Sequence, residues 1–207
     1  MDNKERVKKI KEIFDSIYQA HCTLDYKQPY ELLIATQLAA QCTDDRVNII
    51  MQNLSKKYKT LEAYASADLN EFMRDIYSAG FYKNKARNII AASKKIITDF
   101  GGEVPDNMDD LLTLPGVGRK TANLILGDVY GKPAIVVDTH AGRLSRRIGL
   151  TKHDDPYRVE LDLKKIIPPK DQSLFSHQLV WHGRKYCKSR RPECEICPIA
   201  KLCEKRI

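Results

Sequence analysis

The sequence LPGVGRKTANLIL, residues 114–126, decides how the middle of the chain folds. A short helix is expected over 105–114, before the two glycines Gly116 and Gly118, and a helical pattern over 119–129 follows them. Glycine adopts backbone angles that are closed to other residues and keeps a turn clear of side chains. We therefore expect two helices joined by a tight turn, with backbone N–H groups at the second helix start free to bind an anion. A lone G-x-G has a simpler explanation, a helix corner whose glycines only satisfy geometry.

Lys120 stands near the start of the second predicted helix, where the helix dipole disfavours a positive charge. An amine attacks carbon only when it is neutral, and the dipole, neighbouring Arg119 and partial burial all favour the neutral form. Lys120 is therefore a candidate nucleophile. The alternative is a solvated surface lysine that contacts a phosphate group.

Helical periodicity prevails along the rest of the chain. Thr43 or Asp44 can cap a helix that runs through Leu54, and Ser66 can cap one that ends before Gly80. Further helices are expected over 83–100, 156–167 and 173–186. The run AIVV, 134–137, is the only strand-like stretch and is too short to establish a sheet. The sequence thus predicts an all-α fold.

The composition indicates a partner that carries negative charge. The 207 residues include 35 Lys and Arg against 27 Asp and Glu, a formal charge of +8, which favours a polyanion. No stretch approaches the roughly 18 uninterrupted apolar residues of a membrane span. The start, MDNKERVKKIKEIF, lacks the apolar region of a secretory signal. We therefore expect an intracellular protein that does not enter a membrane.

The cysteines indicate a metal centre. Four of the six crowd into the last 21 positions, at Cys187, Cys194, Cys197 and Cys203. In a reducing compartment such crowding favours metal ligation over disulfides. Four thiolates can bind zinc, but zinc ribbons usually pair two Cys-x2-Cys knuckles and this tail has one; four thiolates can equally hold an iron-sulphur cluster. Cys22 and Cys42 are expected to be small buried apolar residues.

The chain resembles the endonuclease III family of DNA repair enzymes nearly end to end. The resemblance rests on LPGVGRKTAN, LAAQCTDD, GFYKNKARNI, GGEVP, VDTHAGR, HGRKYC and the C-x6-C-x2-C-x5-C spacing of the final cysteines. It implies an all-α, two-lobed helix-hairpin-helix DNA glycosylase fold, with a C-terminal loop in which the four cysteines hold a [4Fe-4S] cluster. The expected domains are 22–132, which contains the hairpin, and 1–21 plus 133–207, which carries the cluster.

The resemblance also implies an activity. The enzyme would remove oxidised pyrimidines from damaged double-stranded DNA and cleave the resulting abasic site by β-elimination. Lys120 would attack C1′ of the nucleotide and form a Schiff base, while Asp138 would stabilise positive charge on the sugar and help to activate the lysine. Asp138 is also well placed to cap a helix over 139–149, and the two roles are compatible. The family usually has bulkier apolar residues where this chain has Ala141 and Gly142.

The same resemblance implies which residues contact DNA. It also implies a monomer that is associated with the nucleoid. The expected DNA-binding residues are Gln41, Gly116, Gly118, Thr121, Arg143 and Arg190. Gln41 would occupy the space left by an extruded nucleotide, although a polar residue at a helix end needs no such role. Arg190 lies in a basic loop that the cluster would fix at both ends and present to the DNA backbone.

Two other functions stay open at this point. A mismatch-specific thymine glycosylase of the same superfamily shares these motifs. An adenine glycosylase is disfavoured, since those enzymes lack a lysine at the position of Lys120 and carry an extra C-terminal domain. A non-catalytic iron-sulphur protein for DNA binding or electron transfer would not need Lys120 and would form no covalent adduct with an abasic sugar.

Overall fold

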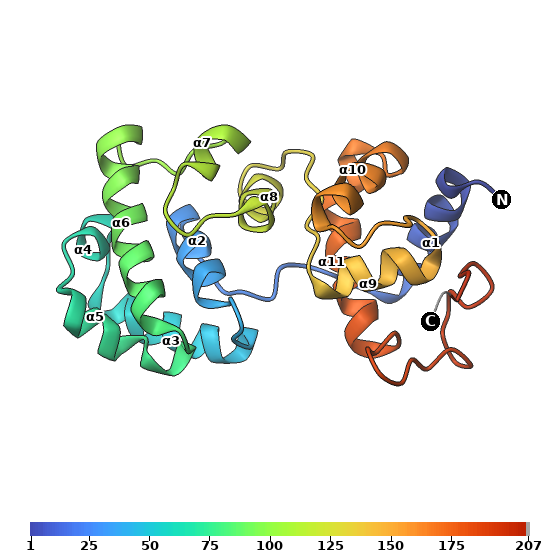
Figure 1. The fold of residues 1–207 in the computed structure, drawn as a ribbon, viewed down its shortest axis with the longest axis horizontal. Helices are drawn as coiled ribbons and strands as arrows, with labels where there is room; N and C mark the ends of the chain where they lie inside the picture. Colours follow the sequence, from blue (N-terminus) through green and yellow to red (C-terminus); the bar gives the residue numbers. More distant parts are fainter. Residues whose placement is uncertain (206–207) are drawn as a thin grey trace. The chain divides into compact units, whose positions relative to one another are not determined.

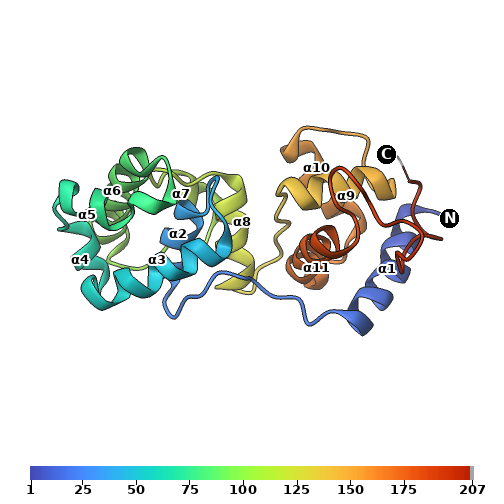
Figure 2. The same ribbon diagram turned by 90° about the horizontal axis from the view of Figure 1, so that it is seen from below.

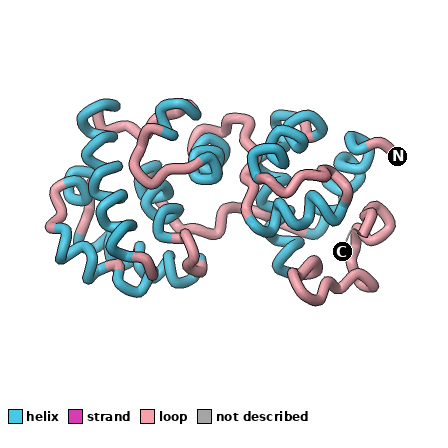
Figure 3. The backbone as a smooth tube through the Cα atoms, in the orientation of Figure 1, coloured by secondary structure: helices cyan, strands magenta, loops and turns pink. Residues whose placement is uncertain are grey.

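The computed structural model describes residues 1–205, and every regular element in that range is a helix (Figure 3). The all-α prediction is therefore confirmed. The described residues form eleven α-helices and two 3-10 helices. None of the helices in this part of the chain is long and apolar enough to cross a membrane. The chain divides into two compact units, one of residues 22–130 and one of residues 1–21 with 131–207.

The unit of residues 22–130 is built around α2, which packs against α3, α6 and α8 (Figure 1). The elements of this unit are α2 (Pro29–Leu38), α3 (Asp44–Lys57), α4 (Leu61–Ala65), α5 (Leu69–Asp75), η1 (Tyr77–Ala79), α6 (Tyr82–Phe100), α7 (Met108–Leu112) and α8 (Arg119–Asp128). Most residues of α2 are buried, because a helix with neighbours on several sides is apolar on most of its surface. The long α6 also covers α4 and α5.

Side-chain caps determine where several helices of this unit begin. Thr43 caps α3, which confirms one of the two predicted alternatives. The prediction for Ser66 is wrong, since Asp68 caps α5 by accepting a hydrogen bond from a backbone N–H at 2.8 Å. The Ser66 hydroxyl instead donates to the Glu62 carbonyl at 2.7 Å and ends α4. With only five residues, α4 is too short to show a helical period of its own.

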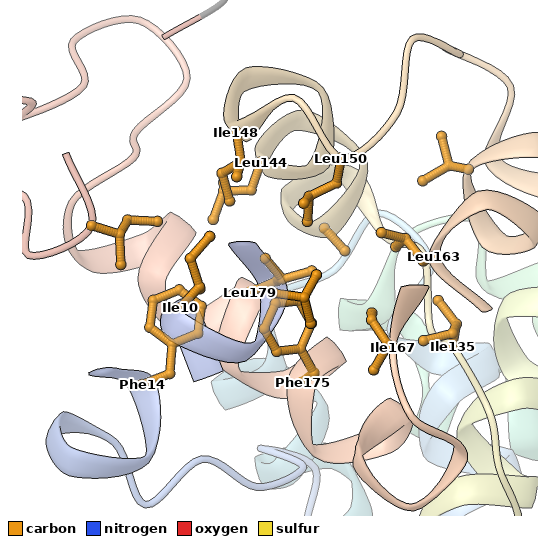
Figure 4. Packing of buried hydrophobic residues seen from close by; sticks show 14 of the residues in the cluster. Ile10, Phe14, Ile135, Leu144, Ile148, Leu150, Leu163, Ile167, Phe175 and Leu179 are labelled. Atoms are coloured by element: carbon orange, nitrogen blue, oxygen red, sulfur yellow. The ribbon is translucent and has the colours of Figure 1, made fainter. Parts of the chain in front are cut away.

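The second unit joins the N-terminal helix to the C-terminal part of the chain. Its elements are α1 (Asn3–Ile17), α9 (Thr139–Ile148), α10 (Pro156–Ile166), η2 (Pro169–Asp171) and α11 (Gln172–Lys185). Helix α9 packs against both α10 and α11, as Figure 2 shows, and α1 packs against α10. In the core drawn in Figure 4, Phe14 of α1 meets Phe175 of α11 with ring centroids 5.9 Å apart. The first and last helices of the chain thus share one core.

The AIVV run, 134–137, is extended but forms no strand within the described residues. Its first three residues are buried, and the amide of Val136 donates to the Ser176 hydroxyl at 3.0 Å. A buried N–H group needs a partner, and here a side chain of α11 supplies it in place of a neighbouring strand. This anchored segment leads directly into Asp138 at the start of α9.

Candidate functional site

Gly116 forms the corner of the turn between α7 and α8. Its φ of +76° lies in the left-handed region, and the Val117 amide closes the turn by donating to the Leu114 carbonyl at 3.1 Å. A Cβ on Gly116 would lie 2.7 Å from Gln37 Oε1 and 2.9 Å from Asn88 Cβ, closer than side chains pack. Both the backbone angles and the packing therefore require glycine at this position.

Gly118 serves a different purpose, and the prediction that it needs angles closed to other residues is wrong. Its φ of −107° and ψ of 177° are those of extended backbone, and a Cβ there would meet no atom within 4 Å. Gly118 is the N-cap of α8, and no side chain caps this helix. An α-helix does not pair the N–H groups of its own first turn. Glycine at 118 therefore leaves open space in front of a helix start that can bind an anion.

Lys120 is the second residue of α8, and it is exposed. The Cys22 thiol of the same unit lies near enough for the charge of Lys120 to affect it. Burial, with the charges of Asp128 and Asp44, raises the pKa of Cys22 to about 11, and the positive charge of Lys120 opposes this rise. The exposed Lys120 is accessible to a ligand.

A pocket beside the hairpin brings together residues that lie far apart in the sequence. Its lining includes Gln41, Phe81, Lys85, Gly116 and Thr121. Gln41 follows α2, Phe81 immediately precedes α6, and Thr121 lies in the first turn of α8 next to Lys120. Three of the predicted DNA-binding residues, Gln41, Gly116 and Thr121, therefore line one pocket.

Sequence reasoning missed Phe81. In GFYKNKARNI it lies between Gly80 and the helix predicted over 83–100, and nothing marks it as exposed. In the structure Phe81 has a left-handed backbone, with φ +48°, and is 67% exposed. Holding an aromatic side chain in solvent on a strained backbone costs free energy, and such strain clusters at ligand sites. Phe81 therefore joins Gln41, whose φ is +56°, as a candidate ligand contact.

Asp138 caps α9 and belongs to the other unit. Its Oδ1 accepts a hydrogen bond from the Ala141 amide at 2.7 Å, which confirms the predicted cap. The residue is half-buried, and Oδ2 has no hydrogen-bond partner among residues 1–205. The cap thus orients the carboxylate while one oxygen stays available to a positive charge.

The four cysteines of the tail line one small cavity. None of them forms a disulfide, and the remaining walls include the apolar side chains of Leu144, Ile148 and Ile199. Within the described part of the chain, no three His, Cys, Asp or Glu side chains converge closely enough to hold a single metal ion. The thiols instead surround a shared space with apolar walls. Four cysteine thiolates of this kind are the usual ligand set of an iron-sulphur cluster.

Hydrogen-bond donors point at the sulphur atoms of this cavity. Arg147 Nη1 lies 3.5 Å from Cys187 Sγ, and a backbone amide lies 3.3 Å from Cys203 Sγ. The His182 Nε2 atom lies 3.3 Å from Cys197 Sγ. Donors around the sulphurs stabilise the negative charge of a thiolate-bound cluster. The donor set and its surroundings therefore fit an iron-sulphur group.

Two arginines of α9 hold the loop that follows the first cysteine. The Arg143 guanidinium donates to the Cys187 carbonyl at 2.9 and 3.1 Å. Arg147 donates to the carbonyls of Lys188 and Ser189, both at 2.8 Å. Arg143 thus faces the loop backbone, whereas Arg190 is exposed further along the same loop.

Comparison with known proteins identifies the family. A family model described as "HhH-GPD superfamily base excision DNA repair protein" matches residues 34–169, and one described as "iron-sulfur binding domain of endonuclease III" matches residues 187–203. The chain is 48% identical to endonuclease III of Synechocystis sp., over 97% of this chain and 92% of that protein. It is 46% identical to endonuclease III of Bacillus subtilis, over 92% of this chain and 88% of that protein.

Solved structures agree with these matches. A trapped endonuclease III–DNA covalent intermediate superposes with a TM-score of 0.93 at 42% identity, covering 99% of this chain and 97% of that one. A thermostable thymine-DNA glycosylase gives a TM-score of 0.85 at 27% identity, covering 98% of this chain and 95% of that one. The chain therefore belongs to the endonuclease III family of the HhH-GPD superfamily, and it is a base-excision DNA repair enzyme that carries a [4Fe-4S] cluster.

Proposed function

We propose that the protein removes oxidised pyrimidine bases from damaged double-stranded DNA and then cleaves the abasic site, with Lys120 as the nucleophile. The observation that carries this proposal is the exposed amine of Lys120 on the second residue of a helix that no side chain caps. The start of this helix can hold a phosphate of the target strand through backbone amides.

The chemistry begins with the neutral Lys120 amine. Its Nζ forms a bond to C1′ of the damaged nucleotide while the bond from C1′ to the base breaks, and the base leaves with that electron pair and takes up a proton. The nitrogen loses one proton, and the ring oxygen then leaves C1′ and is protonated, which gives a protonated Schiff base. The iminium makes the C2′ proton acidic. Removal of that proton breaks the C3′–O bond, and water later releases Lys120.

Asp138 has the proposed role of stabilising positive charge on the sugar and of accepting a proton from the lysine. The hydrogen bond from the Ala141 amide orients its carboxylate before substrate binds. A fixed carboxylate near a developing oxocarbenium charge needs no reorganisation during the reaction. Its position as an N-cap therefore supports the catalytic role and does not compete with it.

Two groups of residues supply the proposed DNA contacts. Gly116 and Gly118 shape the hairpin that receives a phosphate, and Thr121 lies in the first turn of α8 behind it. Gln41 and Phe81 would fill the gap that an extruded nucleotide leaves in the duplex, because an unstacked site needs an occupant. Such contacts to the backbone and to the gap are independent of base sequence.

The cysteine-rich tail supplies the other DNA contacts. We assign Cys187, Cys194, Cys197 and Cys203 as the cluster ligands. When bound, the cluster supplies a rigid iron-sulphur link between the ends of the loop. Arg190 on that loop would contact phosphates directly, and Arg143 would act by holding the loop backbone at Cys187. We further propose that residues 22–132 form the hairpin domain, that 1–21 plus 133–207 form the cluster domain, and that the enzyme works as a cytoplasmic monomer on nucleoid DNA.

Borohydride trapping tests the proposal. The protein is incubated with duplex DNA that contains an abasic site or thymine glycol, and the Schiff base is reduced to a stable protein–DNA adduct. We expect the adduct with the wild-type chain and none with Lys120→Ala. Lys83→Ala is a matched control, because Lys83 is also an exposed second residue of a helix, α6, that no side chain caps. Trapping that survives unchanged in Lys120→Ala would rule out Lys120 as the nucleophile.

A second substrate separates the proposed damage preference from mismatch repair. Duplexes with a thymine opposite guanine are compared with duplexes that contain thymine glycol. Faster base release from thymine glycol supports the assignment to oxidised pyrimidines. Preferential release of the mismatched thymine would assign the chain to the thymine glycosylase activity named for one of its structural neighbours.

A further inference from the structure

Lys85 is a buried cation that takes no part in the chemistry described above. It is 7% exposed, on the first turn of α6. Its ammonium group donates to the carbonyls of Leu38 at 2.8 Å, Ala40 at 2.7 Å and Ala79 at 2.8 Å. An ammonium group has three N–H donors, so each of them is used.

The three carbonyls belong to two segments that are far apart in the sequence. Leu38 and Ala40 lie at the end of α2 and just after it, and Ala79 ends η1. Each segment leads within two residues to an exposed side chain on a left-handed backbone. Gln41, with φ +56°, follows Ala40, and Phe81, with φ +48°, follows Ala79 and Gly80.

This convergence is specific to these two segments. Among residues 1–205, Gln41 and Phe81 share a positive φ with one other non-glycine residue, Lys205. A left-handed conformation is unfavourable for a residue with a Cβ, so it persists only where the surroundings fix it. Lys85 contacts the backbone next to both residues at once, and all three line the same pocket.

The three hydrogen bonds to carbonyls explain why residue 85 is a lysine, although a buried position would otherwise favour an apolar side chain. Burial lowers the pKa of Lys85, which shows that the cation is held against a desolvation penalty. Lys85 has no carboxylate partner within the described residues, and the three carbonyls supply its compensation. A methionine of similar length would fill the space but would leave three carbonyls, two of them in buried contacts, without this donor.

We propose that Lys85 is a positioning residue that ties the Gln41 segment to the Phe81 turn, so that both side chains meet damaged DNA as one preformed pair. This inference rests on the proposed function, in which Gln41 and Phe81 occupy the gap left by the extruded nucleotide. Its consequence is that the two segments are ordered before DNA binds. Preorganisation of this kind strengthens binding, because the cost of ordering the segments is met during folding.

The test begins with Lys85→Met and a duplex that contains a tetrahydrofuran analogue of an abasic site. We expect affinity to fall about 10- to 100-fold, the effect of ordering one or two backbone residues on binding. Lys83→Met is the matched control, because Lys83 lies on the same turn of α6 but is exposed. We expect the control to keep affinity within about threefold, as for a single screened surface charge. Borohydride trapping is measured separately, on a duplex with a true abasic site, because the tetrahydrofuran analogue cannot form a Schiff base. At saturating DNA, Lys85→Met should reach the wild-type extent of trapping, since Lys120 and α8 are unchanged.

A double-mutant cycle separates positioning from a general structural role. In the background Gln41→Ala with Phe81→Ala, Lys85→Met should cost less than about threefold, because the pair that it positions has gone. An equal loss in both backgrounds would overturn the inference. If Lys85→Met does not fold, as judged by circular dichroism, Lys85→Arg keeps the charge and several donors and goes through the same cycle.

The cycle also distinguishes this inference from the function on which it rests. If the background variant binds the analogue as tightly as the wild type does, the proposed DNA role of Gln41 and Phe81 is wrong, and the positioning role fails with it. If that variant binds weakly and Lys85→Met weakens it by the full wild-type factor, the DNA role stands and the positioning role alone fails.

Discussion

Replacing Gly116 with alanine should destabilise the hairpin unit, although the change adds a single methyl group. The left-handed backbone at φ +76° costs about 1–2 kcal/mol for a residue with a Cβ. The new Cβ would also lie 2.7 Å from Gln37 Oε1 and 2.9 Å from Asn88 Cβ, and Gln37 is 6% exposed, so it has little room to move. Overpacking of this kind costs about 1–3 kcal/mol. We therefore expect Gly116→Ala to lower the free energy of unfolding by about 3 kcal/mol, within the summed range of about 2–5 kcal/mol.

Gly118→Ala is the matched control and should leave stability nearly unchanged. Its backbone is extended and a Cβ would meet no atom within 4 Å, so alanine fits without strain. The loss of unfolded-state freedom, about 0.4–1 kcal/mol, is offset because alanine is a poorer N-cap than glycine by a similar amount. The methyl group would, however, occupy the open space in front of the α8 amides. If a phosphate binds there, affinity for abasic DNA should fall about tenfold, or about 1.4 kcal/mol.

Urea unfolding measures the two variants within one experiment. With a slope of about 2–3 kcal/mol per molar, the Gly116→Ala midpoint should fall by about 1–1.5 M when followed by far-ultraviolet circular dichroism. The single tryptophan, Trp181, lies in the other unit, so its fluorescence shows whether the loss is confined to residues 22–130. Wild-type stability in Gly116→Ala, or an equal loss in Gly118→Ala, would refute the reasoning. Undiminished DNA affinity in Gly118→Ala would refute the phosphate site.

Three further predictions concern the second unit. Asp138→Asn should keep the free energy of unfolding within about 0.5 kcal/mol of the wild type, because Asn is an equally good N-cap, yet it should slow borohydride trapping at least about 100-fold. An equal loss of stability in Asp138→Asn and Asp138→Ala would contradict the capping role. Arg147→Ala should weaken DNA binding and leave the salt dependence nearly unchanged, whereas Arg190→Ala should reduce the slope of log affinity against log salt by about 1; the reverse pattern would exchange the two roles. Chelating the iron should abolish visible absorption and expose the loop over 187–203 to protease. The circular dichroism of the helices should change little, since that loop contains no helix. Protection of the loop from protease after iron loss would show that the cluster does not hold it.

Local signals predicted the helices, and the errors arose where tertiary contacts decided the outcome. Helical periodicity found the long elements because each buries one apolar face, as in α1 and α6. Ser66 and Asp68 are both good caps in isolation, and the choice between them depends on where the preceding short helix ends. The AIVV run resembles a strand because its first three residues are buried, although a serine hydroxyl satisfies its amide.

The proposed catalytic and cluster-binding residues could be selected from the sequence for different reasons. A lysine at a helix start conflicts with the helix dipole, and four crowded cysteines exceed what folding requires. An aspartate before a helix is an ordinary N-cap, so only the family resemblance marked Asp138 as a candidate. Phe81 and Lys85 could not be found in this way. Both are common residue types. The proposed role of Phe81 depends on a left-handed backbone, and that of Lys85 depends on carbonyls 45 and 47 residues earlier in the chain.

The two glycines of LPGVGRKTANLIL therefore differ in what requires them: backbone angles and packing require Gly116, whereas the proposed phosphate site would require Gly118. Gly116 is required by contacts inside the unit, with Gln37 on α2 and Asn88 on α6. These contacts hold the start of α8 against α2 and α6. Gln41 follows the end of α2, and Phe81 precedes the start of α6. Lys120 is the second residue of α8. The side chains that would fill the DNA gap and the amine that would attack the sugar consequently belong to one compact unit. Because this unit sets their spacing, loosening it at Lys85 or Gly116 should weaken the capture of damaged DNA before it alters the intrinsic reactivity of the amine.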